Sequence, residues 1–284
     1  MSIRNIALGN TEEMLVLVKR IENAISSTGL PYQKLLVRDT DGNEVTVMNF
    51  EDKITAKAPF TAVVNISADD YRSSVSYKTK GSVKIESQDN FRSFLPKGHI
   101  QERDSWNELV RMSKDIRPVL RKLVGGVLMN CKDKFKEMPL SVQSYARQNG
   151  ILEATLKLTK AASAMADIMQ LDKDLMLAGA MLYYVGAVDL MDDACNETAA
   201  DTLIGISVAS HDKLTKVIFS IMMGNDEETK KLLQDGKDDI EKLNHILLSR
   251  LRGLPTATPE ALALRHLDTI VTETDVIHET TKEM

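Results

Sequence analysis

The chain is poor in cysteine, and this limits the chemistry that it can carry. Its 284 residues include two cysteines, Cys131 and Cys195, which lie far apart and outside any Cys-x-x-Cys or Cys/His spacing. Because a disulfide framework needs more cysteines at closer spacings, we expect two free thiols in a reducing compartment.

A basic excess and long apolar runs are also missing. The formal net charge is -5 at pH 7, which excludes a uniformly basic nucleic-acid binder but leaves room for a local basic groove. The longest nearly uncharged apolar run, residues 175–188, is too short to cross a bilayer. The N-terminal MSIRNIALGNTEEM lacks the basic-then-apolar order of a signal peptide. We therefore expect a soluble, cytoplasmic protein with no membrane partner.

The first ninety or so residues contain a series of strand patterns. QKLLVRD and EVTVMNF alternate with period two, and TDGN between them carries the Asp-Gly signal of a hairpin turn. FTAVVNIS and SVSYKTKGSVKIE are further β-rich runs. MLVLVKRIENAI fits both the strand and the helix period, and we interpret it as the first strand because a loop follows it. Five short strands predict a small barrel or open sandwich over residues 1–88.

From Ser105 onward the apolar period is that of helices. Ser105 and Glu108 form a capping-box pattern, which predicts a helix over 105–135 with bends or breaks at Pro118 and Gly125-Gly126. Helical spacing continues over 141–168, 172–186, 198–211, 212–223, 236–251 and 258–280, with predicted N-caps at Asp172, Thr198 and Thr258. These patterns predict an all-helical domain over 105–284, joined to the barrel by a linker over 89–104.

Several strings in the second half, together with this domain order, resemble a known family. The strings are GILEAT at 150–155, DKDLMLAGAMLYYVGAV at 172–188, LIGISVAS at 203–210, HILLSRLRG at 245–253 and TPEALALRHLD at 258–268. Over residues 14–275 the chain resembles the YhaM-like bacterial 3′→5′ exoribonucleases, which join an OB-fold to a metal-dependent HD phosphohydrolase domain. The resemblance implies an α+β multidomain protein, with a five-stranded OB-type β-barrel followed by an all-α HD-like domain.

The resemblance also implies that this chain has lost most of the metal ligands of an HD domain. The replaced positions are Ala154 and Ile206 for two histidines, Tyr183 and Tyr184 for the His-Asp pair, and Arg250 on or beside a further histidine. His245 and Asp268 remain as vestigial positions. Tyrosine, isoleucine and alanine cannot replace imidazole or carboxylate ligands at neutral pH, so we expect no metal, no cofactor and no hydrolysis. The aromatic pair is expected to fill the vacated space.

The barrel gives the clearer functional signal, because OB-folds bind single strands with aromatic rings and basic side chains. From Leu30 to Ile85 the chain has eight basic and seven acidic residues, so a positive groove would require segregation of charge. About half of the aromatic rings are expected to face inward. The predicted contacts to single-stranded DNA or RNA are Lys19, Arg20, Tyr32, Lys34, Arg38, Phe50, Lys53, Tyr71, Arg72, Tyr77, Lys78 and Lys80.

The sequence leaves three functions open. The first, which we adopt, is a non-catalytic protein that binds single-stranded nucleic acid. The loss of catalytic residues would fit a phage-borne copy of a cellular enzyme. The second is an interaction or inhibitor module whose helical domain docks onto a protein partner, and a homo-oligomer through that domain is compatible with both. The third is a residual metal-dependent hydrolase that uses His245, Asp268 and Asp189.

Overall fold

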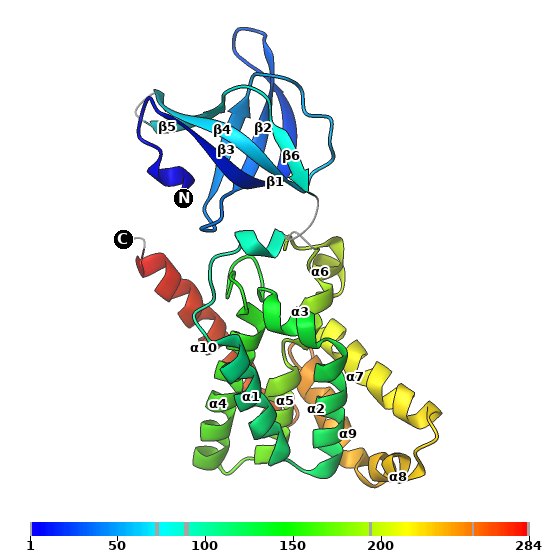
Figure 1. Cartoon of the computed structure of the whole chain (residues 1–284). Helices are drawn as coiled ribbons and strands as arrows, with labels where there is room; N and C mark the ends of the chain where they lie inside the picture. The colour runs from blue at the N-terminus through cyan, green and yellow to red at the C-terminus, as the bar shows by residue number, and fades with distance from the viewer. Residues whose placement is uncertain (1, 72–73, 88–90, 193–194, 252, 283–284) are drawn as a thin grey trace. The chain divides into compact units, whose positions relative to one another are not determined.

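The chain folds into two compact units, Met1–Lys97 and Gly98–Met284 (Figure 1). A computed structural model of the chain describes residues 2–71, 74–87, 91–192, 195–251 and 253–282. The first unit is a β-barrel and the second is helical, as the change of hydrophobic period near Ser105 predicts. No helix in these described ranges has both the length and the apolar character needed to cross a membrane.

The barrel is a closed ring of five strands with a sixth strand added. The strands are β1 (Thr11–Ile25), β2 (Pro31–Arg38), β3 (Glu44–Asn49), β4 (Phe60–Tyr71), β5 (Ser74–Thr79) and β6 (Lys84–Ser87). Their order is β1-β2-β3-β5-β4-β6, and a further pairing of β1 with β4 closes the ring. This closure confirms the predicted barrel and rules out the open sandwich. The β3–β5 pair is parallel, and the other pairs are antiparallel.

Two of the strand predictions need correction. The run SVSYKTKGSVKIE forms two strands, β5 and β6, because the chain turns at Gly81, whose φ of +77° is unfavourable for side-chain-bearing residues. β1 is fifteen residues long rather than short. Residues 11–18 of β1 pair with β4 and residues 17–25 pair with β2, so one strand serves two sides of the barrel.

The helical unit is built around a helix that is buried along almost its whole length. Its elements are α1 (Glu102–Lys114), α2 (Pro118–Asn130), α3 (Lys132–Glu137), α4 (Gly150–Met169), α5 (Lys173–Leu182), η3 (Val185–Asp189), α6 (Ala199–Leu203), α7 (Gly205–Met223), α8 (Glu227–Asp235), α9 (Lys237–Leu248) and α10 (Pro259–Lys282). Every residue of α5 from Leu175 to Leu182 is buried, and α5 packs against α1, α2, α4, α9 and α10. The apolar run 175–188 is therefore buried in the core of the helical unit.

The predicted helix over 105–135 is three helices. α1 begins at Glu102 with Gln101 as N-cap, so the capping box at Ser105 was wrong. Pro118 does mark a break, since it occupies the first turn of α2, where a missing N–H is tolerated. The Gly125-Gly126 pair does not break the helix, since α2 is continuous from Pro118 to Asn130. Gly126 packs against Val217 of α7, where a Cβ would lie 2.9 Å from a Val217 methyl.

Further helix limits differ from the predicted ones. α4 begins at Gly150 rather than at residue 141, because Tyr145 and Asn149 adopt positive φ values of 50° and 61° that no helix allows. α7 runs without interruption across the expected boundary at residue 212. Asp172 caps α5 as predicted, since its carboxylate accepts the Leu175 amide.

The other two predicted N-caps behave differently from each other. Thr258 Oγ1 accepts the Ala261 amide at 3.2 Å, so this residue caps α10 as predicted. Thr198 occupies the N-cap position of α6 but makes no side-chain cap bond. Its hydroxyl instead donates to the Leu190 carbonyl at 3.0 Å.

Candidate functional site

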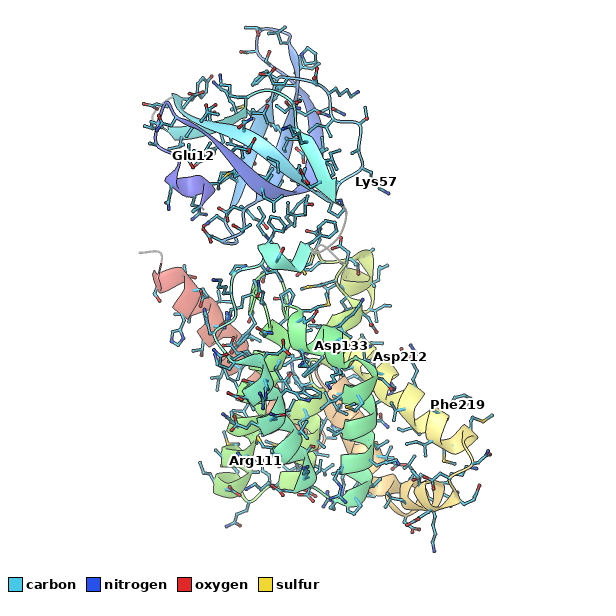
Figure 2. The ribbon with its side chains drawn as sticks, in the orientation of Figure 1. Glu12, Lys57, Arg111, Asp133, Asp212 and Phe219 are labelled. Atoms are coloured by element: carbon cyan, nitrogen blue, oxygen red, sulfur yellow. The ribbon has the colours of Figure 1, made fainter. Side chains whose placement is uncertain are left out.

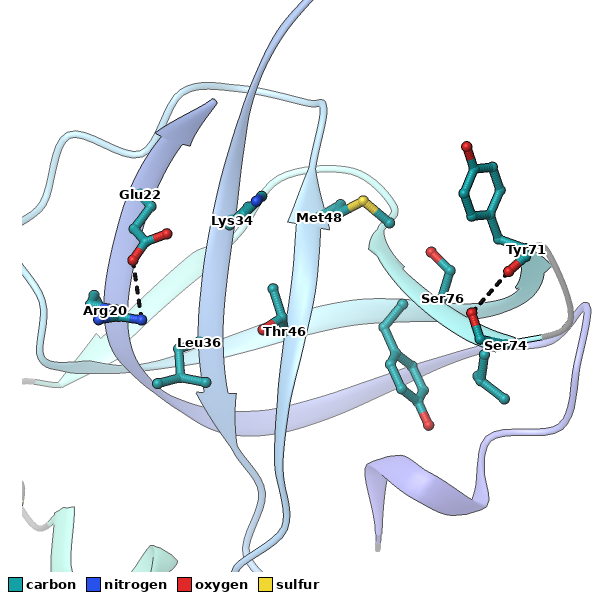
Figure 3. A pocket seen from close by; sticks show the side chains of 11 residues that line it. Arg20, Glu22, Lys34, Leu36, Thr46, Met48, Tyr71, Ser74 and Ser76 are labelled. Atoms are coloured by element: carbon teal, nitrogen blue, oxygen red, sulfur yellow. Dashed lines mark hydrogen bonds and ion pairs between the residues drawn. The ribbon is translucent and has the colours of Figure 1, made fainter. Parts of the chain in front are cut away.

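A groove of about 470 Å³ lies on the outer face of the barrel (Figure 3). Strands β1, β2 and β3 form its floor and one wall, and the β4–β5 hairpin forms the other wall. Four of the predicted contact residues line this barrel groove: Arg20, Lys34, Tyr71 and Tyr77. The structure thus brings together residues that are up to fifty-seven positions apart in the chain.

A bulge in β1 places Arg20 on this face. Before the bulge, Val16 and Val18 point into the barrel core. The pairing of β1 with β2 shifts by one residue between Val18 and Arg20. Since side chains alternate with a strict period of two, such a shift moves the following even-numbered residues to the other face. Arg20 and Glu22 are exposed accordingly.

The strand register arranges the floor of the groove in rows. Arg20 pairs with Leu36 and Leu36 with Thr46, while Lys34 pairs with both Glu22 and Met48. Leu35 and Val37, which alternate with Lys34 and Leu36 along β2, are buried in the core. The floor therefore combines the apolar side chains of Leu36 and Met48 with the cations of Arg20 and Lys34.

Two of the predicted cations are engaged by an internal carboxylate. Lys19 Nζ donates to Glu44 Oε1 at 2.7 Å, and Arg38 Nε donates to the same oxygen at 2.7 Å. Burial alone would raise the pKa of Glu44, but the Lys19 ammonium and the Arg38 guanidinium outweigh it and lower that pKa. Neither cation lines the groove. Glu44 offsets one of these two positive charges and holds both side chains at the barrel wall, away from the groove.

The remaining predicted cations differ in how free they are. Lys78 pairs with Asp69 at 3.1 Å, and Arg20 pairs with Glu22 at 3.1 Å across an exposed surface, where such pairs are weak. Within the described parts of the chain, no ion pair within 4.0 Å involves Lys34, Lys53 or Lys80. Arg72 lies outside the described residues.

The predicted aromatic residues fall into two groups. Tyr71 is 54% exposed at the rim of the groove, whereas Tyr77 is half-buried and packs against the barrel core. Tyr32 and Phe50 do not line the groove. They stack on each other with ring centroids 4.8 Å apart and an interplanar angle of 16°.

The sequence did not point to Leu36, Met48 or Ser76, which also line the groove. Leu36 shares the outward phase of Lys34 on β2, so pairing the two predicted strands could have found it. The Oγ atom of Ser76 is buried and has no hydrogen-bond partner within the described residues. Ser76 could not be assigned to the groove from the sequence, because β5 reaches β3 only through the parallel pairing of the closed barrel.

The helical unit contains a second cluster of predicted residues, made of Tyr183, Tyr184, Arg250 and Asp268. Tyr184 Oη donates to Asp268 Oδ1 at 2.7 Å, and Arg250 Nε donates to Asp268 Oδ2 at 3.0 Å. The Arg250 guanidinium carbon lies 4.6 Å from the Tyr183 ring centroid. The two tyrosine rings meet edge to face at 5.7 Å. The structure thus joins four positions that the resemblance assigned to one vanished site.

The two tyrosines of this Tyr-Arg-Asp cluster are buried, Arg250 and Asp268 are partly buried, and the carboxylate is occupied. Both tyrosines are buried, and burial raises the pKa of each phenol well above its usual value, with Asp268 adding to the effect on Tyr184. The phenols therefore stay neutral, and Asp268 accepts bonds from Tyr184 and Arg250. Across the described ranges, no three His, Cys, Asp or Glu side chains converge in a way that could hold a metal ion.

The other positions assigned by the resemblance lie in different contacts. His245 Nε2 accepts the Ala257 amide at 2.9 Å, which uses the lone pair that a metal would need. Ala154 is buried within α4. Ile206 is half-buried near the start of α7, and its carbonyl lies against Gly186. Asp189 pairs with Lys213 at 2.6 Å.

Comparison with known proteins assigns no family to this chain. No protein-family model matches it, and no solved structure matches it. The function therefore has to be inferred from the barrel groove and the Tyr-Arg-Asp cluster.

Proposed function

We propose that this chain is a non-catalytic protein that binds single-stranded nucleic acid in the barrel groove. The observation that carries the proposal is the place of the groove on the barrel. In an OB-fold, oligonucleotides bind on the face of strands 2 and 3 and against the loops that follow strands 1 and 4. Here the groove lies over β2 and β3 and against the β4–β5 hairpin, and the strand order closes a five-stranded ring.

The chemistry of the groove fits a single strand better than a duplex. Bases can lie on the apolar floor of Leu36 and Met48 and against the exposed ring of Tyr71, while Arg20 and Lys34 meet phosphates. Stacking and phosphate contacts are largely indifferent to base identity. With two such cations, binding should depend on salt only moderately, with a slope of log K against log salt of about -1.4.

In this proposal the helical unit is an HD-like scaffold without catalysis, as the resemblance to the YhaM-like exonucleases implies. The Tyr-Arg-Asp cluster supports it. A hydrolytic metal needs several imidazole or carboxylate ligands, whereas Asp268 is the one carboxylate of this cluster and is held by a guanidinium. A neutral phenol bonded to a carboxylate that an arginine also holds supplies no nucleophile.

The proposal is tested by fluorescence anisotropy of labelled single-stranded DNA and RNA over a series of salt concentrations. We expect binding that weakens with salt, and we expect Lys34→Glu to weaken it about tenfold or more, since a charge reversal removes one phosphate contact and adds repulsion. Lys57→Glu is the matched control. Lys57 is exposed between β3 and β4 and does not line the groove (Figure 2). Absence of salt-dependent binding at micromolar protein would contradict the proposal.

A second candidate, self-association through the helical unit, rests on exposed side chains of α7. Phe219, Met222 and Met223 are 64%, 39% and 70% exposed and recur at helical spacing on one face. Figure 2 shows Phe219 projecting from the helix. Contiguous exposed apolar surface often marks an interface. Light scattering after size exclusion distinguishes this candidate: a dimer that Phe219→Glu dissociates supports it, and a monomer at all concentrations rejects it.

A further inference from the structure

The hairpin formed by β1 and β2 extends beyond the barrel as a fixed arm (Figure 1). Pairing between the two strands continues to Ile25 and Pro31 at its far end. The turn is closed by two bonds between Ser26 and Leu30: the Ser26 amide donates to the Leu30 carbonyl at 2.8 Å, and the Leu30 amide donates to Ser26 Oγ at 2.9 Å. Thr28 Oγ1 lies 2.9 Å from Ser26 Oγ as well. A turn held by so many bonds presents its side chains in a defined place.

This arm carries more exposed apolar surface than a soluble hairpin requires. Ile25 is 76% exposed, Leu30 61% and Phe50, which lies just after β3, 45%. Tyr32 stacks on Phe50 within the same surface. Such a surface, rich in aromatic and apolar groups, is typical of a binding site rather than of a solvated turn.

The Tyr32–Phe50 stack leaves room for another ring. On β1, the residue that pairs with Tyr32 is Ala24. A methyl group is the smallest side chain that could stand there, so the face of Tyr32 turned away from Phe50 is not covered by a larger neighbour on β1. Beyond Val18, no strand among the described residues pairs with the other edge of β1. A planar group can therefore approach over Ala24 from the side of the sheet.

A polar network beneath the stack fixes the chain that carries Phe50. Asn49 Nδ2 donates to the Asp52 carbonyl at 3.0 Å, and Asn49 Oδ1 accepts the Glu51 amide at 3.2 Å and Thr79 Oγ1 at 2.8 Å. Gln33 binds both the amide and the carbonyl of Ile54. These bonds hold the segment after β3 against the barrel end. The ring of Phe50 is thereby positioned without help from a ligand, which lowers the entropic cost of binding.

The stack lies in line with the barrel groove. Tyr32 lies two residues before Lys34 on β2, and Phe50 lies two residues after Met48, just beyond the end of β3, so both share the strand phase of the groove floor. Two strand residues span about 7 Å, a step that one nucleotide of an extended strand can make. A second hollow, of about 710 Å³, has Tyr32 and Lys53 among its lining residues. Ala24 lines this hollow as well, so open space adjoins Tyr32 on the β1 side of the stack.

We propose that Tyr32 and Phe50 form a base-stacking subsite that extends the barrel groove by one nucleotide. The ligand is thus a short single strand that runs along β2 and β3 from the groove to the arm. This inference rests on the proposed function, because it assumes that the groove binds nucleic acid. Ala24 acts as the specificity-determining residue, since its size admits a planar base beside Tyr32.

The test is an affinity series with labelled oligothymidylates and oligouridylates of two to twelve nucleotides. For the unaltered chain we expect affinity to rise with length until both the groove and the subsite are filled. Tyr32→Ala and Phe50→Ala should each lower the affinity for long oligomers by about 5- to 150-fold, the usual range for one stacked base. The shortest oligomers should be affected less, because they fill the groove alone. Leu15→Ala, which removes an exposed apolar side chain elsewhere on β1, is the matched control and should leave affinity unchanged.

Ala24→Leu provides a second test, which adds a larger side chain and removes no aromatic ring. The larger side chain should cover the open face of Tyr32 and shorten the length at which affinity stops rising by one nucleotide. A fluorescent adenine analogue placed along the oligomer should be quenched at the subsite in the unaltered chain and not in Ala24→Leu.

The two proposals fail in different ways. If the chain binds oligomers and Lys34→Glu weakens that binding, while Tyr32→Ala, Phe50→Ala and Ala24→Leu have no effect, the subsite is rejected and the groove stands. If no oligomer of any length binds, both are rejected. Circular dichroism of each variant, unchanged from that of the parent chain, excludes loss of the fold as the cause.

Discussion

The two units of this chain use the same residue types, tyrosine and arginine beside carboxylates, with opposite results. In the barrel, Tyr32 stacks on Phe50 at the surface, and Arg20 makes an exposed pair with Glu22. In the helical unit, Tyr183 and Tyr184 are buried against Arg250, whose charge Asp268 compensates. The difference lies in solvent access and not in composition. Exposed rings and cations can still contact a ligand, whereas buried ones contact each other because they need partners inside the protein.

The two units also differ in net charge. The first ninety-seven residues contain thirteen basic and twelve acidic side chains, while the rest of the chain contains twenty-three and twenty-nine. The helical unit is therefore acidic and repels polyanions at long range. The barrel is nearly neutral, so its attraction for phosphates depends on which cations are internally compensated. Glu44 binds two of them, Lys19 and Arg38, and its single negative charge offsets one of the two.

The largest expected effect is on the buried cluster. Asp268→Ala should lower the free energy of unfolding of the helical unit by about 3–5 kcal/mol, because it leaves Arg250 and the Tyr184 hydroxyl without their shared acceptor. Urea unfolding followed by the fluorescence of Trp106, the single tryptophan, reports on this unit. Asp212→Ala breaks an exposed pair with Lys216 and should change stability by less than about 0.5 kcal/mol. If both variants lowered the free energy of unfolding equally, the buried cluster would contribute no more to stability than an exposed ion pair.

A smaller effect concerns Glu44, whose two cationic partners lower its pKa from 4.5. A carboxylate with a lowered folded-state pKa stabilises the fold above its unfolded-state pKa, and this stabilisation is lost as the pH falls through the folded-state pKa. Glu44→Gln should therefore destabilise the barrel by roughly 1–2 kcal/mol at pH 7. The difference from the unaltered chain should shrink as the pH falls below 4.5. Hydrogen exchange of the β2 and β3 amides measures it.

The same substitution sharpens the comparison between the units. Glu44→Gln releases Lys19 and Arg38 from their carboxylate, so the oligonucleotide affinity of the barrel should rise and its salt dependence should steepen. A variant with lower stability and unchanged salt dependence would show that these cations cannot reach a phosphate even when free.

Lys34→Ala should have a modest effect on binding. Loss of one phosphate contact should lower affinity by about threefold to tenfold and reduce the magnitude of the salt slope by about 0.7. Anisotropy titrations at several salt concentrations give both quantities. Lys80→Ala, an exposed lysine that does not line the groove, is the control. An equal loss at both lysines would indicate diffuse attraction instead of a groove.

The smallest effect concerns α2, where the sequence suggests a break and the structure has a continuous helix. Gly125→Ala should raise the free energy of unfolding by about 0.5–1 kcal/mol, because no atom lies within 4 Å of the added Cβ and alanine favours the helix. Gly126→Ala should not show this gain, since its Cβ would lie 2.9 Å from a Val217 methyl. Trp106 fluorescence in urea compares the pair. A gain of equal size at both positions would contradict the close packing of α2 on α7.

The sequence by itself determined the two-part architecture, because hydrophobic period is a local property. Period two over QKLLVRD and EVTVMNF and helical spacing in the second half require no knowledge of partners. The apolar run 175–188 could be recognised in the same way, whereas its place at the centre of the helical unit came from the structure. The aromatic and basic residues near the groove could be named for the same reason, although their roles could not.

Only the tertiary structure decided which of these residues share a face and which are free. The bulge after Val18 turns Arg20 outward, and no sequence pattern marks it. Glu44 reaches Lys19 across twenty-five residues, and Tyr184 reaches Asp268 across eighty-four. Charge compensation and burial depend on such distant contacts, which form only when the chain closes. For this reason composition could identify the candidates, and only the closed fold separates exposed aromatic rings from those that fill a core.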